Sequence, residues 1–87
     1  MDHQRLDTFL WHARVAGQRS ACAEMAASGL VRINRQPTDK PHAKVRVGDV
    51  LTVPLQPRVI VVRVLKLVER RGPAAAAREL YEELTEG

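Results

Sequence analysis

The spacing of apolar residues changes once along this chain, near Gly29, and this change constrains the fold more than any other feature. Before it, one stripe follows the helical spacing i, i+3, i+4 and i+7, formed by Leu6, Phe9, Leu10 and Ala13. After it, apolar and polar residues alternate, as in Val31-Arg32-Ile33, which is typical of a strand with one buried face. The pattern predicts an α+β fold in which two N-terminal helices pack on a small antiparallel sheet.

Two helices are expected before Gly29. The first covers RLDTFLWHARV and is predicted to end near residue 16, because Gly17 follows. The second is predicted over residues 19–28, with Gly29 in the left-handed conformation just beyond it. Its residues spaced for burial are Cys22, Met25 and Ala26. Since the connection is short, we expect the two helices to pack as a pair.

Short strands fill the middle of the chain. The first strand, residues 31–33, is expected to end at the turn Asn34-Arg35, and residues 36–44 contain two prolines and are expected to be mostly loop. The sequence KVRVGDVLTVPL predicts two strands around a Gly48-Asp49 turn. The residues that share a face of the second are Leu51, Val53 and Leu55. A turn at Gln56-Pro57 then leads into the longest predicted strand, RVIVVRVLKLV.

A last helix is expected after Gly72-Pro73, because proline is favoured at the first helical position. Its predicted buried stripe consists of Ala77, Leu80, Tyr81 and Leu84. Its glutamates are expected on a solvated face that would repel other anions, and these are Glu79, Glu82, Glu83 and Glu86. With 87 residues the chain is long enough for one core, so residues 1–87 are expected to form a single domain.

The charge is unevenly distributed. Residues 1–73 carry thirteen Lys and Arg against six Asp and Glu, whereas residues 74–87 carry one Arg against four Glu. A basic body of this kind attracts polyanions, because each neutralised phosphate releases counterions. Nucleic acid is therefore the expected partner, and the sequence alone leaves DNA as well as RNA open.

Several classes of protein are not favoured by the sequence. Cys22 is the single cysteine, which excludes an internal disulfide and fits a reducing, cytoplasmic location. The longest aliphatic run, residues 59–62, is too short to span a membrane. His3, His12 and His42 do not have metal-ligand spacing, so we expect surface histidines and no metal. No nucleophile lies beside a base, so we expect no enzyme activity and no cofactor.

The order and spacing of many residues between 5 and 53 resemble the S-four RNA-binding domain, named for the fourth protein of the ribosomal small subunit. The residues that carry this resemblance are Arg5-Leu6-Asp7, Phe9-Leu10, Arg14, Arg19, Gly29, Val31, Ile33-Asn34, Lys40-Pro41 and Gly48-Asp49. Together with Leu10-Trp11, Ala13-Arg14 and the downstream ERRGPAAAARELYEEL, the chain resembles the heat-shock-protein-fifteen family of small bacterial proteins.

The resemblance implies the S-four type fold, also called alpha-L, with its core motif at 5–53 and a C-terminal strand and helix at 58–85. It also implies a stress-related, ribosome-associated protein that binds ribosomal RNA, on the large subunit, along the helix pair and the adjoining strands. The predicted RNA-binding residues are Arg5, Arg14, Arg19, Arg32, Lys40, Lys44 and Arg46. We expect them to form one continuous surface that contacts phosphates, and we expect a monomer.

Some positions depart from the family pattern. Gln18 stands where a serine or threonine usually caps the second helix, and a lost cap costs about 1 kcal/mol. Ser20 is an alternative cap. Arg35 replaces the glycine of an Asn-Gly turn, so it must either adopt a positive φ, at roughly 1 to 2 kcal/mol, or relax the turn. His42 replaces a small hydroxyl residue, and the protein is expected to lack the basic C-terminal tail of longer relatives.

Alternative interpretations remain for the singled-out residues. The arginines at 5, 14 and 19 either contact phosphate or pair with Asp7 and Glu24 as a solvated face. Asp7 itself is expected to orient a neighbouring arginine. Trp11 either stacks on an unpaired base or packs beside Tyr81. Most other cations are expected to be solvated strand and loop charges, with Arg70-Arg71 as a second basic patch.

Two alternative functions also follow. The chain would be a substrate-positioning module of an RNA-modifying enzyme complex if it associates with a catalytic partner. It would be a protein-interaction domain if its basic face meets an acidic protein instead of RNA.

Overall fold

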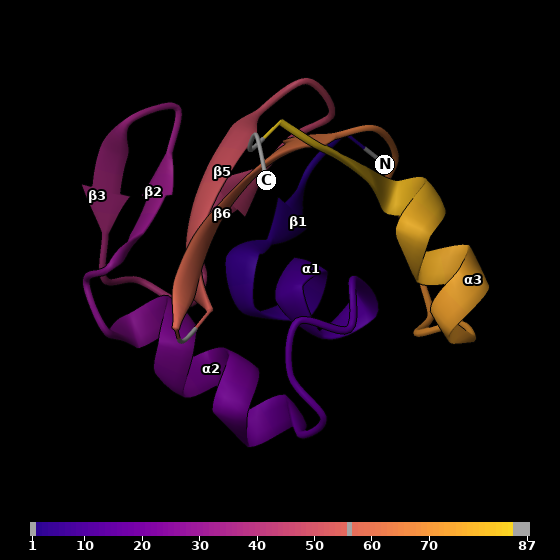
Figure 1. The fold of residues 1–87 in the computed structure, drawn as a ribbon, viewed down its shortest axis with the longest axis horizontal. Helices are drawn as coiled ribbons and strands as arrows, with labels where there is room; N and C mark the ends of the chain where they lie inside the picture. The colour runs from indigo at the N-terminus through magenta and orange to yellow at the C-terminus, as the bar shows by residue number, and fades with distance from the viewer. Residues whose placement is uncertain (1, 56, 85–87) are drawn as a thin grey trace.

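The computed structural model describes residues 2–55 and 57–84 and shows an α+β fold (Figure 1). Its elements in chain order are β1 (Gln4–Arg5), α1 (Leu6–His12), α2 (Arg19–Ala27), β2 (Val31–Ile33), β3 (Gln36–Thr38), β4 (Lys44–Val45), β5 (Val50–Leu55), β6 (Arg58–Val64), α3 (Ala74–Ala77), the 3-10 helix η1 (Arg78–Leu80) and β7 (Tyr81–Glu83). The predicted fold class is confirmed.

Five strands form one antiparallel sheet in the order β3-β2-β5-β6-β7, and β1 pairs with β4 in a separate two-stranded sheet. In Figure 1 the larger sheet curves around α1, with α2 below α1 and α3 on the side away from β2 and β3. The helix α1 therefore lies at the centre of the fold, inside the curve of the sheet.

The core lies between α1, α2 and the inner face of the sheet. The predicted stripe of α1 is confirmed, since Leu6, Phe9, Leu10 and Ala13 are all buried. The sheet contributes the alternating residues Val31, Leu51, Val53, Ile60, Val62 and Val64. Cys22 is fully buried in this core, and burial raises the pKa of its thiol.

The helix α1 ends earlier than the sequence predicts, at His12 and not near residue 16. Arg14 has a φ of +58°. The amide of Arg14 donates to the Trp11 carbonyl at 3.1 Å and that of Val15 donates to the Leu10 carbonyl at 3.0 Å, which is the Schellman pattern of a helix end. Arginine takes the position that glycine usually holds, so the predicted stop at Gly17 is wrong.

A backbone turn caps the other end of α1. The residue before the helix, Arg5, makes no side-chain cap. Instead the amide of Leu6 donates to the Ala43 carbonyl at 2.8 Å and the amide of Asp7 to the Pro41 carbonyl at 3.0 Å. These bonds satisfy amides that a helix start leaves unpaired, and they hold the turn before β4 against the start of α1.

The second helix agrees with its prediction. It covers Arg19–Ala27, with Gly29 at a φ of +83° beyond its end. Cys22 and Ala26 are buried on it, and Met25 packs against the core as a partly buried side chain. Gln18 precedes it without a side-chain cap bond, as its side chain predicts.

A tight hairpin joins β2 to β3. Ile33 pairs with Gln36, so the loop consists of Asn34 and Arg35 alone, at φ +52° and +73°. Two successive positive φ values are typical of a type I′ turn, whose twist matches that of paired strands. Of the two alternatives for Arg35, the positive φ is the one observed. The expected loop after residue 36 is partly wrong, because β3 is a strand, and Pro37 is tolerated there since β3 lies at the sheet edge.

Arg35→Gly is expected to raise the free energy of unfolding by roughly 1 kcal/mol, because glycine adopts the positive φ without a Cβ penalty. Urea denaturation of the two proteins measures this difference. Arg32→Gly is the matched control, since it removes the same charge from a strand position and is expected to destabilise. A loss of stability in Arg35→Gly would show that the turn carries no such strain.

The segment after residue 57 follows the prediction only in part. β6 is the longest of the described strands but ends at Val64. The expected last helix is short: α3 has four residues, η1 has three, and Tyr81–Glu83 pairs with β6 as β7. Pairing with the open edge of β6 overrides the helical pattern there. Gln56, which was predicted in a turn, and Glu86, which was predicted on the last helix, lie outside the described residues.

Candidate nucleic-acid interface

Four of the predicted residues gather at the start of α1. In the β1–β4 ladder Arg5 pairs with Lys44, so residues nearly forty positions apart lie directly across from each other. Arg46 follows β4, and its positive charge helps to lower the pKa of Asp2 after the larger effect of His3. Lys40 belongs to the turn that caps α1. We call this group, Arg5, Lys40, Lys44 and Arg46, the β1–β4 cluster.

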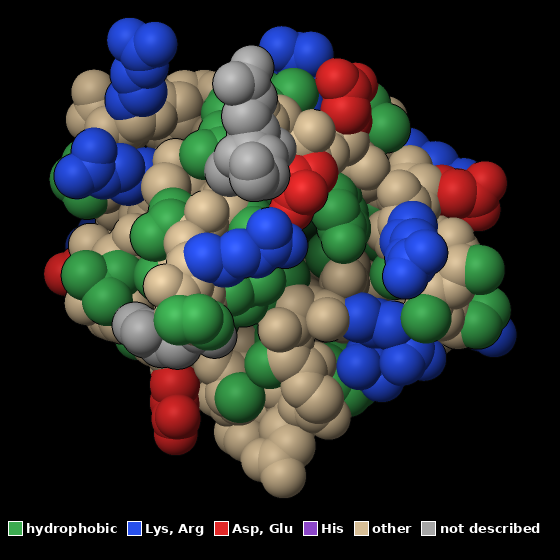
Figure 2. All heavy atoms as spheres, viewed as in Figure 1, with side chains coloured by type: hydrophobic (Ala, Val, Ile, Leu, Met, Phe, Trp, Pro, Cys, Tyr) green, Lys and Arg blue, Asp and Glu red, His purple; other side chains and the backbone are tan. Residues whose placement is uncertain are grey.

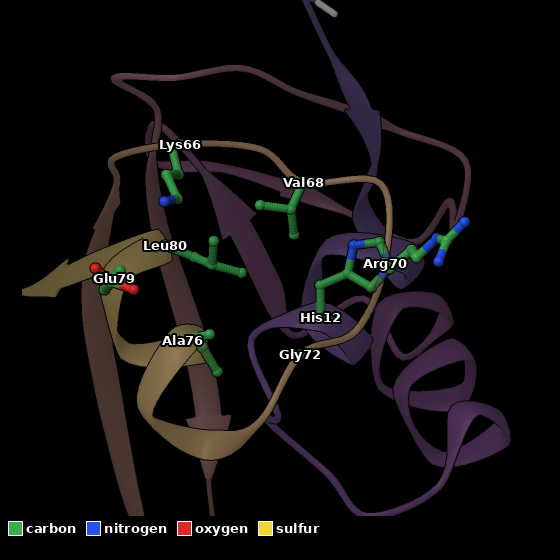
Figure 3. A pocket seen from close by; sticks show the side chains of 9 residues that line it. His12, Lys66, Val68, Arg70, Gly72, Ala76, Glu79 and Leu80 are labelled. Carbon is green, nitrogen blue, oxygen red and sulfur yellow. The ribbon is translucent and has the colours of Figure 1, made fainter.

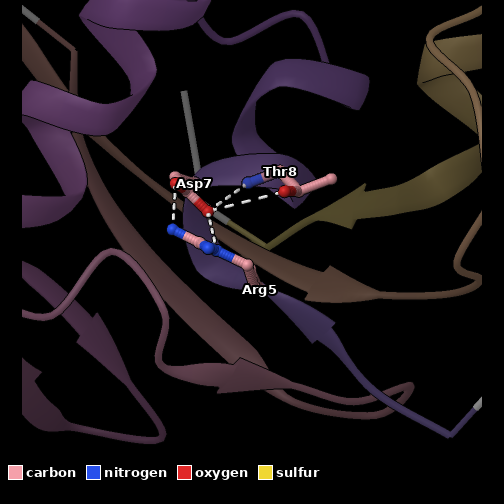
Figure 4. A network of polar contacts seen from close by, with 3 residues as sticks. All are labelled: Arg5, Asp7 and Thr8. Carbon is pink, nitrogen blue, oxygen red and sulfur yellow. Dashed lines mark hydrogen bonds and ion pairs between the residues drawn. The ribbon is translucent and has the colours of Figure 1, made fainter.

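Asp7 holds the guanidinium of Arg5 in place (Figure 4). The Nε and Nη2 atoms of Arg5 donate to the two Asp7 oxygens at 3.1 and 3.0 Å. Asp7 Oδ1 also accepts from the Thr8 amide at 2.8 Å. The Asp7 side chain is 18% exposed whereas that of Arg5 is 60% exposed. The predicted orienting role of Asp7 is confirmed, and Arg5 presents the rest of its guanidinium to solvent.

The other three members of the β1–β4 cluster, Lys40, Lys44 and Arg46, are exposed to solvent. Lys40 Nζ lies 3.9 Å from Asp39 Oδ1, with both side chains more than two thirds exposed, and such a pair contributes little to stability. Lys44 and Arg46 are exposed on either side of the buried Val45, so they point to the same side of the strand. Their charges are therefore available to a phosphate backbone.

A second group of cations surrounds the C-terminal end of α1. Arg14 Nε donates to the Gly72 carbonyl at 2.9 Å. Arg71 Nε donates to the Trp11 carbonyl at 3.1 Å, and its Nη2 to the Ala16 carbonyl at 3.5 Å. We call this group, Arg14, Arg19, Arg70 and Arg71, the helix-end cluster. In Figure 2 Lys and Arg side chains gather on the surface next to α3.

Trp11 packs in a way that the sequence did not suggest. The guanidinium carbon of Arg71 lies 3.7 Å from the centre of the Trp11 ring, a cation–π contact. Arg71 thereby covers one face of the indole and reduces its availability to a base. Tyr81 lines a different, apolar cavity with Phe9 and Leu10. Arg71 is half buried, so its interpretation as a solvated charge is wrong.

Arg32 is separated from the other predicted residues. It lies in β2 between the inward-facing Val31 and Ile33 and pairs with Pro37 and Thr52. Its side chain is therefore on the outer face of the sheet, away from α1. The expected single surface is thus divided: the β1–β4 cluster at one end of α1, the helix-end cluster at the other, and Arg32 behind the sheet.

His12 is buried, which corrects its interpretation as a surface residue. Only 5% of its surface is exposed. Burial lowers the pKa of His12, and the positive charges of Arg19 and Arg71 lower it further, while the Val68 carbonyl has the opposite effect. Helical periodicity could not reveal the burial of His12, because the segment that covers this side chain comes from residues 66–80 (Figure 3).

The lowered pKa of His12 predicts a loss of stability in mild acid. Unfolded chains take up a proton near the usual value of 6.5, before the folded protein does, so the free energy of unfolding falls as the pH drops below about 6.5. The fall approaches at most about 1.4 kcal/mol per pH unit and ends below the folded pKa. Urea denaturation from pH 7.5 to 5 measures it. His12→Gln is expected to remove this dependence, and His42→Gln, at an exposed position, to retain it.

Within residues 2–55 and 57–84 no group of three or more His, Cys, Asp or Glu side chains is placed to hold a metal ion. None of the helices there is long and apolar enough to cross a membrane.

Comparison with known proteins gives consistent matches. A family model described as the S4 domain matches residues 4–51. Heat shock protein 15 of Escherichia coli strain K12 is 38% identical over 82 residues, which are 94% of this chain and 61% of that protein. The RQC P-site tRNA stabilizing factor of Listeria innocua is 30% identical over 82 residues, 94% of this chain and 87% of that protein.

A solved structure of Vibrio cholerae Heat Shock Protein 15, described as trimeric, has the same fold. It matches with a TM-score of 0.86 and 32% identity, over 94% of this chain and 82% of that one. The chain thus spans most of the Vibrio and Listeria proteins but only 61% of the Escherichia coli relative's length.

Proposed function

This chain belongs to the S4 domain family and, within it, to the Heat shock protein 15 family, and from this premise we propose that it is a non-enzymatic, cytoplasmic protein that binds structured RNA on the ribosome. We further propose that the RNA is ribosomal RNA of the large subunit. The observation that carries the proposal is the β1–β4 cluster, in which an oriented, exposed Arg5 lies across from Lys44.

The geometry suits phosphate recognition. Arginine presents paired donors in a planar fork and stays charged at any working pH. Asp7 limits the rotation of the Arg5 side chain, so less conformational entropy is lost when a phosphate binds. Lys40, Lys44 and Arg46 add charge around it, which favours recognition of RNA shape and backbone over bases.

The name of the Listeria relative indicates a class of RNA. The Listeria relative is named for P-site tRNA, which is a tRNA held on the ribosome, so ribosomal RNA and tRNA are the two candidate ligands. Crosslinking in cells, followed by sequencing of the attached RNA, distinguishes them. We expect a cluster of crosslinks in one region of large-subunit RNA, and crosslinks spread evenly over messenger RNA would contradict the proposal.

Salt dependence tests the mechanism. If about five phosphates are neutralised, the logarithm of RNA affinity should fall with the logarithm of salt concentration at a slope of roughly −3 to −5. Filter binding of large-subunit RNA at KCl concentrations from about 50 to about 300 mM measures this slope. A slope near zero would exclude phosphate neutralisation, and equal competition by duplex DNA would show that RNA geometry is not read.

The alternatives give different results in the same experiments. A protein-interaction domain would retain its partner after nuclease treatment, whereas an RNA-binding protein would release it. A module of an RNA-modifying enzyme would co-purify with a catalytic subunit. Sedimentation velocity of the free chain tests the expected monomer, which stays a prediction beside a relative described as trimeric.

A further inference from the structure

Three residues other than glycine adopt a positive φ within the described part of the chain, and these are Arg14, Asn34 and Arg35. This conformation brings the Cβ atom of an L residue too close to the following carbonyl oxygen, so its cost must be compensated by other interactions. The side chain of Arg14 compensates through the hydrogen bond that its Nε atom donates to the Gly72 carbonyl. Asn34 compensates through two hydrogen bonds made by its side-chain amide. Arg35 therefore needs a separate explanation.

The side chain of Arg35 has no such interaction. Its guanidinium makes no hydrogen bond, ion pair or ring contact within residues 2–55 and 57–84, and the residue is exposed. Arg35 borders an open hollow on the outer face of the sheet, and none of the residues that line this hollow with it is acidic; they are Asn34, Val50, Thr52, Val61 and Leu84. Glycine would be more favourable at this position for stability alone. A strained residue that internal contacts do not explain points to a function.

Hydrogen bonds connect the turn of Arg35 to the turn that contains Arg46. Asn34 Nδ2 donates to Asp49 Oδ1 at 2.9 Å, and the amide of Arg46 donates to Asp49 Oδ2 at 2.8 Å. The amide of Val50 also donates to Asn34 Oδ1 at 2.9 Å. One carboxylate thus joins the tip of the β2–β3 hairpin to Arg46, which is a member of the β1–β4 cluster. The fold therefore fixes Arg35 next to this cluster.

We propose that Arg35 contacts a phosphate of the RNA that the β1–β4 cluster binds, and that the strained turn is retained for this contact. The inference rests on the proposed function, because it concerns the same RNA. Arg35 presents a planar fork of donors that no group of the described chain occupies. Its place next to Arg46 extends the basic surface of the cluster onto the tip of the β2–β3 hairpin.

The arrangement favours a nucleic-acid backbone over a single acidic group. Lys44, Arg46 and Arg35 are exposed cations on adjoining segments. Phosphates recur at short intervals along a nucleic acid, so several cations in a row can each meet one. An acidic side chain of a protein partner would engage only one of them. Because phosphate contacts carry no sequence information, Arg35 is expected to add affinity without a base preference.

The test compares RNA affinity and stability in variants of Arg35. Arg35→Gly removes the charge and the strain, whereas Arg35→Gln removes the charge but keeps the Cβ atom and therefore the strain. Both are expected to weaken binding of large-subunit RNA about fivefold to tenfold and to make the salt slope shallower by about 0.8, because one phosphate contact is lost. Arg35→Lys retains the charge and is expected to bind within about threefold of the unaltered protein.

Arg35→Gly gives the sharpest result, because this variant is expected to be more stable than the unaltered protein and to bind RNA more weakly. Damage to the fold would lower both quantities together. Arg58→Gln is the matched control, since Arg58 is exposed and pairs with Leu55, at the end of β5 opposite to Val50. It loses the same charge and is expected to weaken binding less than about twofold.

Binding by Arg35→Gly or Arg35→Gln within about twofold of the unaltered protein would overturn the inference, and so would an equal loss in Arg58→Gln. Replacing Arg5 and Lys44 together by alanine keeps this result distinct from the proposed function. If that double variant binds RNA weakly while the Arg35 variants bind normally, only the role of Arg35 is wrong. If the unaltered protein shows no salt-dependent RNA binding, the proposed function and this inference are both wrong.

Discussion

Replacing Arg5 and Lys44 together by alanine is expected to weaken RNA binding by about 30-fold to 150-fold. Each side chain is predicted to contact a phosphate, and a charge-assisted contact contributes about 1 to 1.5 kcal/mol. The slope of the salt dependence should also become shallower by about 1.5, because two fewer counterions are released. Filter binding at several salt concentrations measures both quantities.

A control with the same loss of charge distinguishes direct contact by Arg5 and Lys44 from the general electrostatic attraction between RNA and a basic protein. Arg58 and Arg63 lie in β6, and both are exposed. The double variant Arg58→Ala and Arg63→Ala loses the same net charge but is expected to lower affinity less than about threefold. Equal losses in the two double variants would mean that the β1–β4 cluster has no special role. Because Arg5 and Lys44 are exposed, circular dichroism should show an intact fold in both.

Arg71→Ala is expected to lower the free energy of unfolding by about 2 to 3 kcal/mol. The substitution removes two hydrogen bonds from a charged donor to the carbonyls of Trp11 and Ala16, and it removes the cation–π contact with the Trp11 ring. Each hydrogen bond contributes about 1 kcal/mol and the ring contact about 0.5 to 1 kcal/mol. Urea denaturation followed by circular dichroism measures the change.

The adjacent residue provides the control for Arg71. Arg70 is exposed, and Arg70→Ala is expected to change stability by less than about 0.5 kcal/mol. Trp11 is the single tryptophan, so its fluorescence reports directly on the ring that Arg71 covers. An unaltered emission spectrum in Arg71→Ala, or equal stability of the two variants, would show that Arg71 does not hold the C-terminal segment on α1.

Much of the core could be predicted from the spacing of apolar residues. The stripe Leu6, Phe9 and Leu10 is buried as expected, and so are the alternating Leu51 and Val53. These predictions succeed because burial of one face imposes a period of 3.6 on helices and of 2 on strands. The pairing of Asp7 with Arg5 could also be predicted, since the two residues are close in sequence and of opposite charge.

Other features depend on contacts between distant segments, which periodicity does not report. The burial of His12 results from residues 66–80, and the strand β7 forms because the edge of β6 is open. Arg14 takes a left-handed conformation that sequence rules assign to glycine. Likewise, the predicted basic residues are grouped by the β1–β4 ladder and the end of α1, and Arg32 lies outside both groups because of its strand register.

The β1–β4 ladder consists of only two residue pairs. Arg5 and Lys44 meet only while this ladder is closed, so a ligand that needs both binds the closed form alone. By thermodynamic linkage, such a ligand at a hundred times its dissociation constant would favour closure by about 2.7 kcal/mol. Amide hydrogen exchange at the start of α1 should therefore slow when RNA is added, because the bound RNA would hold the amino-terminal strand of this protein in place.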